Sequence, residues 1–249
     1  MKTKFERLTT RMSYDSDITD WLRIGASSQF AKTTAQNPAD AEGNNFSNLF
    51  QWSRMIAPIY PIYKHDKDGK ILRDAHGEMV YDDSQSRKYA GGMNLIRQTE
   101  LNITKNINYY LTQNARVDVK LPYNFKFSST ATFNGNWWRW TNMLNPLVGD
   151  GQAYGGILDK EVNQTVSLKW DKTFNDFGVH VMLGHENYNE KTNFLNGEKK
   201  GLLDPTLPEF RSGANISSLD SYGREYKVEG YFGQVTTDYM DKYYASASL

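Results

Sequence analysis

Cysteine is missing from this sequence, and so is any excess of charge: 29 lysines and arginines balance 29 aspartates and glutamates. The lack of cysteine excludes disulfide frameworks, cysteine-based zinc sites and thiol nucleophiles. The balanced charge leaves no basic excess to meet phosphates, so we do not expect a nucleic-acid partner. No P-loop, dinucleotide-binding or nucleophile-elbow pattern is present. We therefore expect neither an enzyme nor a cofactor.

Long hydrophobic runs are also missing. The mean hydropathy is −0.69, and no window approaches the roughly 18 consecutive apolar residues of a transmembrane helix. A transmembrane β-barrel is not excluded, because its strands alternate lipid-facing and lumen-facing residues and so average out as polar. Aromatic residues, in contrast, make up 14% of the chain. This richness suits strands and membrane interfaces, and it suits sugar-binding proteins as well.

Period-two alternation is the dominant pattern of the sequence. It is clearest from Tyr109 to Leu121, where Leu111 and Val117 share one face while Arg116 and Asp118 share the other. Only a β-strand separates apolar from polar residues in this way. Further strands are predicted around residues 7–14, 22–30, 125–133, 162–170, 179–183, 231–239 and 243–249. About eight antiparallel strands, with consecutive strands paired, are expected.

The predicted connections are of two kinds. Short ones, rich in turn-forming residues, lie at residues 17–20, 122–124, 175–176 and 240–242, and long ones cover residues 33–106, 136–160 and 189–229. Short and long connections alternate along the chain. Outer-membrane barrels have this asymmetry, with short periplasmic turns and long extracellular loops, whereas a β-sandwich usually distributes its loop lengths over both ends.

The aromatic residues nearest the short turns lie in phase on the apolar faces of their strands. Together they are typical of an aromatic girdle at a membrane interface, although aromatics could also fill the core of a sandwich. A second group lies about eight residues away, which corresponds to roughly 20 Å of height for tilted strands. The first group is Tyr14, Phe125, Trp170, Phe177, Tyr239 and Tyr243, and the second is Phe30, Tyr109, Phe133 and Tyr231.

Six short segments, taken in order and spacing, carry a family resemblance. They are FERLTTRMSY from Phe5, DWLRIG from Asp20, APIYPIY from Ala57 with Asp68-Gly69 behind it, LGHE from Leu183, YFGQV from Tyr231 and DKYYASASL from Asp241. With them the sequence resembles the barrel region of SusC/RagA-type TonB-dependent transporters of Bacteroidetes. Such barrels have about 22 strands around an N-terminal plug. They import oligosaccharides or peptides, with a surface lipoprotein as a lid and TonB as the driver.

The resemblance implies that residues 1–249 form part of a TonB-dependent receptor β-barrel domain in the bacterial outer membrane. The signal peptide, the plug and the remaining strands are expected to lie outside this sequence, so the chain alone is not expected to transport. The implied partners are outer-membrane lipid, a SusD-like surface lipoprotein, TonB through the plug, and an oligosaccharide or peptide ligand. The alternative is a soluble or surface-exposed β-sandwich that binds glycans through exposed aromatics.

Two groups of residues are candidates for function. Aromatic side chains stack on sugars, so a cluster at the top of a strand is the candidate ligand site; Trp137 and Trp138 should point to opposite faces if that strand continues. Charged residues on the polar strand faces should line the barrel lumen. The ligand candidates are Trp137, Trp138, Trp140 and Tyr154, and the lumen candidates are Arg7, Arg11, Arg23, Arg116, Asp118, Lys120 and Lys169.

Metal sites are not expected. The four histidines fit no zinc spacing. The run from His65 to Lys70 resembles a calcium loop but lacks a third acidic position and a closing glutamate, so an Asp-Gly hairpin turn explains it better. Further upstream, apolar residues near helical spacing in residues 45–56 predict a short amphipathic helix.

Overall fold

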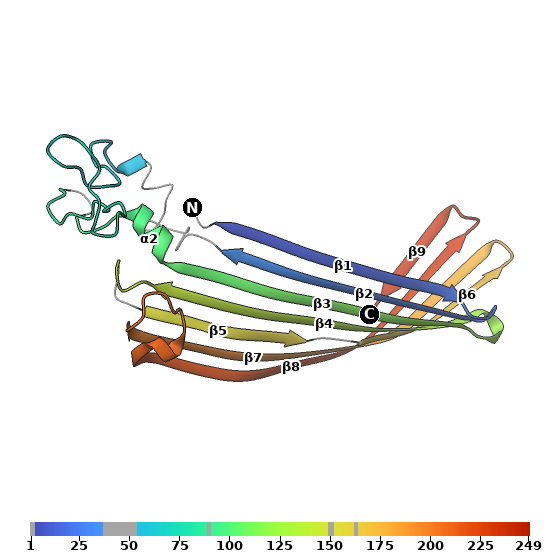
Figure 1. Ribbon diagram of the computed structural model, residues 1–249. Coiled ribbons are helices and arrows are strands. Elements are labelled where there is room, and N and C mark those ends of the chain that lie inside the picture. Colours follow the sequence, from blue (N-terminus) through green and yellow to red (C-terminus); the bar gives the residue numbers. More distant parts are fainter. Residues whose placement is uncertain (1–2, 37–53, 89–90, 149–151, 162–163) are drawn as a thin grey trace.

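The computed structural model describes residues 3–36, 54–88, 91–148, 152–161 and 164–249. In these ranges the chain is all-β, with one antiparallel sheet and short helical segments near its ends (Figure 1). The strands are β1 (Lys4–Asp17), β2 (Leu22–Gln36), β3 (Ile103–Lys120), β4 (Phe125–Leu144), β5 (Gln152–Glu161), β6 (Gln164–Phe174), β7 (Phe177–Leu202), β8 (Gly213–Tyr239) and β9 (Tyr243–Ser248), and the helices are α2 (Leu95–Leu101), η1 (Pro122–Asn124) and η2 (Phe210–Ser212).

The sheet is an up-and-down meander in the order β1-β2-β3-β4-β5-β7-β8-β9. Strand β6 pairs with β4 and β7, which are also the neighbours of β5, so β5 and β6 lie end to end between the same two strands. The nine strands therefore fill eight positions, nine less the one that β5 and β6 share. The predicted antiparallel fold of about eight consecutively paired strands is confirmed.

The register shows that the apolar strand faces coincide. Directly paired residues of antiparallel strands point to the same side of a sheet. Tyr14 pairs with Ala26, Ala26 with Ala115, and Ala115 with Ala131, so one face can be followed from strand to strand. We call it the apolar face, and its other side the polar face. It also carries Met12, Leu22, Ile24, Phe30, Leu111, Val117, Val119, Phe125, Phe127, Phe133, Trp170, Phe177, Val179, Val181, Leu183, Tyr231, Val235, Tyr239 and Tyr243.

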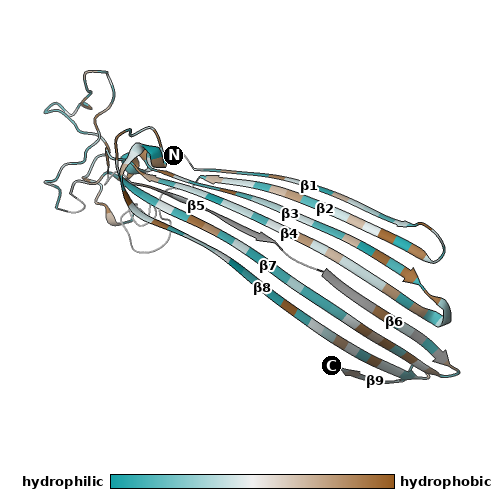
Figure 2. Cartoon of the chain, turned by 90° about the horizontal axis from the view of Figure 1, so that it is seen from below, coloured by the Kyte–Doolittle hydropathy of each residue, from teal (hydrophilic) through white to brown (hydrophobic). Residues whose placement is uncertain are grey.

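No second sheet covers the apolar face in the described part of the chain. Its side chains are exposed or half-buried, with Met12 at 72%, Leu183 at 58% and Tyr231 at 79%. Most hydrophobic colour lies in the half of the strands nearer the short turns (Figure 2). The small buried cluster of Met143, Ala153 and Leu202 lies instead near the opposite end of the sheet. Sandwich packing of this face is therefore not what the chain adopts.

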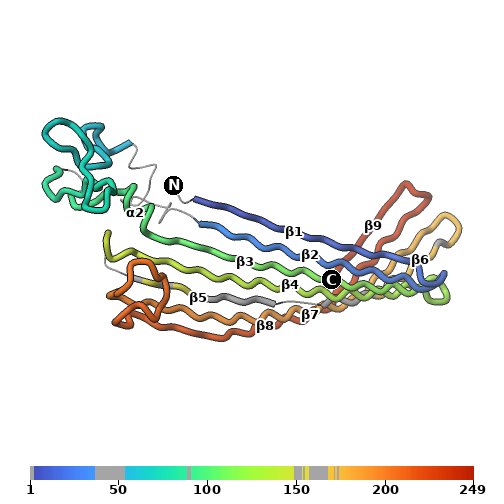
Figure 3. The backbone as a smooth tube through the Cα atoms, in the orientation of Figure 1, coloured from blue at the N-terminus to red at the C-terminus, as the bar shows by residue number. Residues whose placement is uncertain are grey.

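The two ends of the sheet differ as predicted. All four tight turns lie at one end and the long connections at the other, and the turn ends of β6–β9 twist away from those of β1–β4 (Figure 3). Three of the four tight turns place non-glycine residues in the left-handed region, where asparagine and aspartate are tolerated best. Asn124 has φ 65°, Asn175 53°, Met240 54° and Asp241 54°. The alternation of short and long connections is confirmed.

The predicted bounds of the long connections are wrong. Residues 136–160 were expected to be loop, yet β4 runs to Leu144 and β5 occupies Gln152–Glu161. Likewise β7 and β8 cover most of residues 189–229 and are 26 and 27 residues long. The physical reason is that these outer halves carry polar residues on both faces, for example Asn187, Asn189 and Lys191 on the continuation of the apolar face. Alternation is lost although the ladder continues.

No helix in the described ranges is both long and apolar enough to cross a membrane. The helix predicted over residues 45–56 lies almost entirely outside the described residues; only its end is described, and Arg54 and Met55 are helical there.

Candidate functional site: an aromatic and charged polar face

The seven charged lumen candidates all lie on the polar face. The register places Arg7 and Arg11 there in β1, Arg23 in β2, Arg116, Asp118 and Lys120 in β3, and Lys169 in β6. Three of them, Arg23, Arg116 and Asp118, form ion pairs. Arg23 Nη2 lies 2.6 Å from Asp15 Oδ1, and Arg116 Nη2 lies 2.9 Å from Asp118 Oδ2.

Hydroxyl and amide groups add hydrogen bonds across the strands. Ser128 Oγ donates to Asp118 Oδ1 at 2.6 Å. Four residues further along β4 from the tight turn, Thr132 Oγ1 donates to Asn114 Oδ1 at 2.9 Å, and Asn114 Nδ2 donates to Ser27 Oγ at 3.2 Å. These groups lie on three adjacent strands, β2, β3 and β4. Polar side chains that are hydrogen-bonded to one another suit a wall that encloses water rather than lipid.

Nearer the long connections, aromatic rings cover the polar face across several strands. Trp138 and Trp140 in β4 have ring centroids 4.6 Å apart. Trp140 stacks on Phe194 of β7 at 5.9 Å, and Phe194 stacks on Tyr222 of β8 at 4.9 Å. We call these four rings the aromatic platform. A second ring pair on the same face, Tyr188 and Tyr226, lies 5.9 Å apart.

A glycine makes the platform continuous. Strand β5 separates β4 from β7, and Gly156 of β5 is the register partner of Trp140. A Cβ atom at Gly156 would lie 2.2 Å from Cζ2 of Trp140 and 2.3 Å from the carbonyl oxygen of Leu195. Only glycine leaves room for the indole to lie flat over the strand and reach Phe194.

The four predicted ligand residues do not all meet. Trp138 and Trp140 belong to the platform, and Trp138 Nε1 donates to Asn106 Oδ1 at 3.1 Å. Trp137 points to the apolar face, where Tyr109 is its register partner. Of Tyr154 only the backbone is described, and it pairs with Asn142. Phe194 and Tyr222 were not predicted as ligand residues because they lie in residues 189–229, which were expected to be loop.

The first long connection contains a repeat of eight residues, from Asp66 and from Asp74, that was also not predicted from the sequence. In each of two hairpins an aspartate begins the turn and a glycine with positive φ ends it: Asp66 with Gly69 (φ 78°) and Asp74 with Gly77 (φ 83°). The carboxylate of Asp66 accepts the N–H groups of Asp68 and Lys70 at 2.9 and 2.8 Å. The predicted Asp-Gly turn is thus confirmed, and Asp66 Oδ1 accepts hydrogen bonds from the backbone of the turn.

Backbone hydrogen bonds close these hairpins into a triangle. The N–H of Leu72 donates to the carbonyl of Lys64 at 2.8 Å, that of Val80 to Leu72 at 3.0 Å, and that of Lys64 to Val80 at 2.8 Å. The three positions are eight residues apart in sequence. The first long connection therefore presents a folded unit, the hairpin triangle, above the end of the sheet.

Buried polar contacts attach the hairpin triangle to α2. Arg87 is almost completely buried and lies 2.7 Å from Asp82. Asn94 caps α2 through the N–H of Arg97 at 3.1 Å and also donates to the carbonyl of Ile62 at 2.8 Å. Arg97 lies 2.6 Å from Asp83. Burial raises the pKa of Asp83, but hydrogen bonding and charge from Lys64, together with Arg97, outweigh burial and hold that pKa below its usual value.

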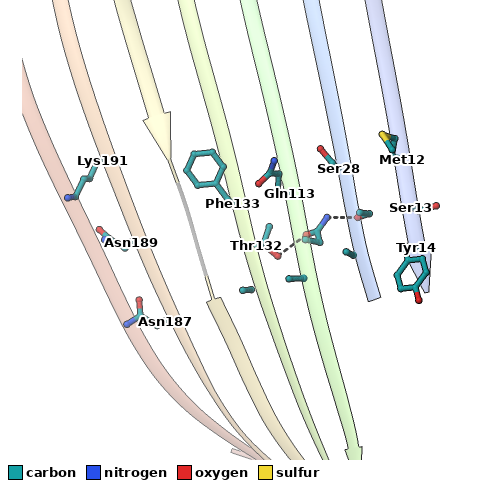
Figure 4. Close-up of a pocket in the computed structure, with 15 residues that line it drawn as sticks. Met12, Ser13, Tyr14, Ser28, Gln113, Thr132, Phe133, Asn187, Asn189 and Lys191 are labelled. Carbon is teal, nitrogen blue, oxygen red and sulfur yellow. Dashed lines mark hydrogen bonds between the residues drawn. The ribbon is translucent and has the colours of Figure 1, made fainter. Parts of the chain in front are cut away.

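A hollow of about 940 Å³ lies along the apolar face near the middle of the strands (Figure 4). Its floor contains Ala26, Ala115 and Ala131, which are register partners of one another, and Asn187 and Lys191 border it on β7. It exists because small side chains meet there across three strands. Its lining mixes apolar side chains such as Met12 and Phe133 with polar ones such as Gln113 and Asn187, so its composition favours neither hydrocarbon nor a polar ligand. Elsewhere in the described ranges, no three histidine, cysteine, aspartate or glutamate side chains gather in an arrangement for a metal ion.

No protein-family model matches the sequence, and no curated protein matches it. Solved structures do match. The structure of the RagAB peptide transporter superposes with a TM-score of 0.75 at 14% identity, covering 99% of this chain and 27% of that chain. The chain has the fold of part of that transporter. The RagAB peptide importer in its closed-closed and open-open states gives TM-scores of 0.74 and 0.74 at 15% and 16% identity.

This chain spans about a quarter of the RagAB chains it matches, 27% in each comparison. At such low sequence identity, the likeness to RagAB shows the fold alone. The resemblance to SusC/RagA-type transporters that the sequence indicated is confirmed at that level. The neighbours in structure are transporters, and the all-β antiparallel fold is the one predicted.

Proposed function

We propose that residues 1–249 form part of the barrel wall and the extracellular loops of a TonB-dependent outer-membrane importer of oligosaccharides or peptides. The observation that carries this proposal is the continuous apolar face of a single-layer sheet. Its rows are in register from β1 to β4 and from β6 to β9, and no protein layer covers it in the described ranges. A bilayer is the environment in which such a face is stable.

The turns, loops and polar face suggest how the sheet would be oriented in the outer membrane. The tight turns would lie in the periplasm, and the hairpin triangle and the outer halves of β4, β7 and β8 would lie outside the cell. The polar face, with the seven charged residues, would line the lumen or contact the plug. The hairpin triangle would offer a surface to a SusD-like lipoprotein, and TonB would act through the plug. The RagAB structures support a partner protein and a peptide cargo by analogy only.

The aromatic platform is the proposed ligand contact. Stacked rings offer flat faces to sugar rings and equally to proline or aromatic residues of a peptide. Since the platform joins three strands on the side proposed to face the lumen, a ligand entering from outside would meet it.

Fractionation of the complete protein tests the proposal. The expected result is recovery in the outer membrane as a heat-modifiable band that requires detergent. Binding of oligosaccharide and peptide libraries should then weaken in Trp140→Ala but not in Trp21→Ala, an exposed tryptophan in the β1–β2 turn. Recovery of the complete protein as a soluble, detergent-free monomer would contradict the membrane assignment.

A further inference from the structure

Three cations lie on the apolar face just beyond its outer aromatic residues. On β2, Lys32 follows Phe30 by two residues; on β4, Arg139 follows Trp137 by two; on β3, Lys105 precedes Tyr109 by four. The register places all of them on the side of Ala115. Three adjacent strands thus change from apolar to aromatic to cationic in the same direction.

The aromatic layer beneath the cations is continuous. Tyr109 is the register partner of both Lys32 and Trp137. The rings of Phe30 and Tyr109 lie 6.4 Å apart, and Lys32 Nζ lies 5.5 Å from the centre of the Tyr109 ring. Tyrosine and tryptophan mark the level at which hydrocarbon gives way to headgroups. Lys32 is level with Tyr109, and Lys105 and Arg139 lie beyond this level, at headgroup height.

No ion pair neutralises this patch in the described part of the chain. None of the three cations forms an ion pair with another described residue, and Lys105 and Arg139 are exposed. Two other cations on the same face are neutralised: Lys4 lies 2.7 Å from Glu6, and Lys227 lies 3.1 Å from Glu225. Lys32, Lys105 and Arg139 are therefore a group of cations on three adjacent strands, β2–β4, without an ion pair among the described residues.

The spacing suits a phosphate group. Arg139 pairs with Ile107, which is two residues from Lys105, so the two cations are diagonal neighbours about 7–8 Å apart at their backbones. Their long side chains can converge on one phosphate, and a guanidinium binds phosphate through two parallel hydrogen bonds. Lys32 lies to one side, within reach of a second anionic group on the same headgroup.

We propose that Lys32, Lys105 and Arg139 form a binding site for an anionic, phosphate-bearing lipid of the outer leaflet, whose acyl chains run down the apolar face. This inference rests on the proposed membrane orientation. It goes beyond the transport function, since it assigns a lipid site on the outside of the wall. Negatively charged membrane surfaces attract lysine and arginine, which supplies the charge complementarity.

The test uses the complete protein, purified from outer membranes in detergent. Binding of lipid A and of dephosphorylated lipid A with the same acyl chains is measured by native mass spectrometry, for the native protein and for K32Q/K105Q/R139Q. The control K67Q/K70Q/K88Q makes the same charge change at exposed lysines of the first long connection. Heat modifiability verifies that each variant is folded, and K32R/K105R should retain binding.

The expected result is preference for the phosphorylated lipid, reduced by about fivefold for each removed charge and on the order of 100-fold for all three. The control should bind as the native protein does. Equal binding of both lipids, an equal loss in the control, or equal affinity for inorganic phosphate would overturn the lipid site while leaving the membrane assignment intact. Absence of the native protein from the outer membrane would overturn the proposed function itself.

Discussion

Arginine in place of Ala115 is the most direct test of what the apolar face contacts. Ala115 is exposed in the middle of this face, and its partners across both neighbouring strands are alanines, so the longer side chain meets no steric obstacle. In water such a surface change would alter the free energy of unfolding by about 0.5 kcal/mol or less. On the lipid face near the bilayer midplane, arginine costs about 2–4 kcal/mol.

Two matched variants make this comparison specific. Thr112→Arg adds the same charge on the polar face of the same strand, where the register partners are Gln29 and Asn134. Thr34→Arg adds it on the apolar side, but beyond the aromatic residues. Both should cost about 1 kcal/mol or less, because the first faces a polar environment and the second lies near or above the interface.

The assay is reversible urea unfolding of the complete protein in lipid vesicles. For Ala115→Arg we expect the folding equilibrium constant to fall by about 30- to 700-fold, which corresponds to the loss of about 2–4 kcal/mol. If Ala115→Arg and Thr112→Arg agree within about 0.5 kcal/mol, the two faces have the same surroundings and the membrane reasoning is refuted.

Three further outcomes follow from local geometry. Arg87→Met should leave Asp82 buried without its partner and open the hairpin triangle, at a cost of about 3–5 kcal/mol, seen as faster proteolysis of that connection with the barrel intact. Met240→Asn should stabilise the β8–β9 turn by up to about 1 kcal/mol in thermal unfolding, because asparagine tolerates φ 54° better. The pKa of Asp83 is lower in the folded protein than in the unfolded chain, where it is about 3.9. The stability that Asp83 contributes is therefore present above the unfolded pKa and is lost as the pH falls through the folded pKa. Proteolysis of the hairpin triangle near pH 3 should show this loss, and Asp83→Asn should abolish the pH dependence.

The sequence was informative wherever the two strand faces have different surroundings. Around Val117 and Asp118 strict alternation predicted the strand, its apolar face and its turn, and all three are found. In the outer half of β7 polar residues occur on both faces, so the alternation is lost and this part of the strand was predicted to be a loop. The platform could be predicted only in part for the same reason. Trp138 and Trp140 lie two residues apart on one strand, whereas Phe194 and Tyr222 join them only through the register.

The length of the outer strands would set where a ligand is first held. Trp140 lies three residues beyond Trp137, the outermost aromatic residue of the apolar face on β4. At about 3.3 Å per residue and a tilt near 40°, Trp140 stands roughly 8 Å above Trp137. The platform would therefore lie at the height of the headgroups, and its rings would meet a ligand before the ligand reaches the depth of the hydrocarbon. Capture and translocation would then be separate events at different heights, so that binding to the platform can be measured without any driver of transport.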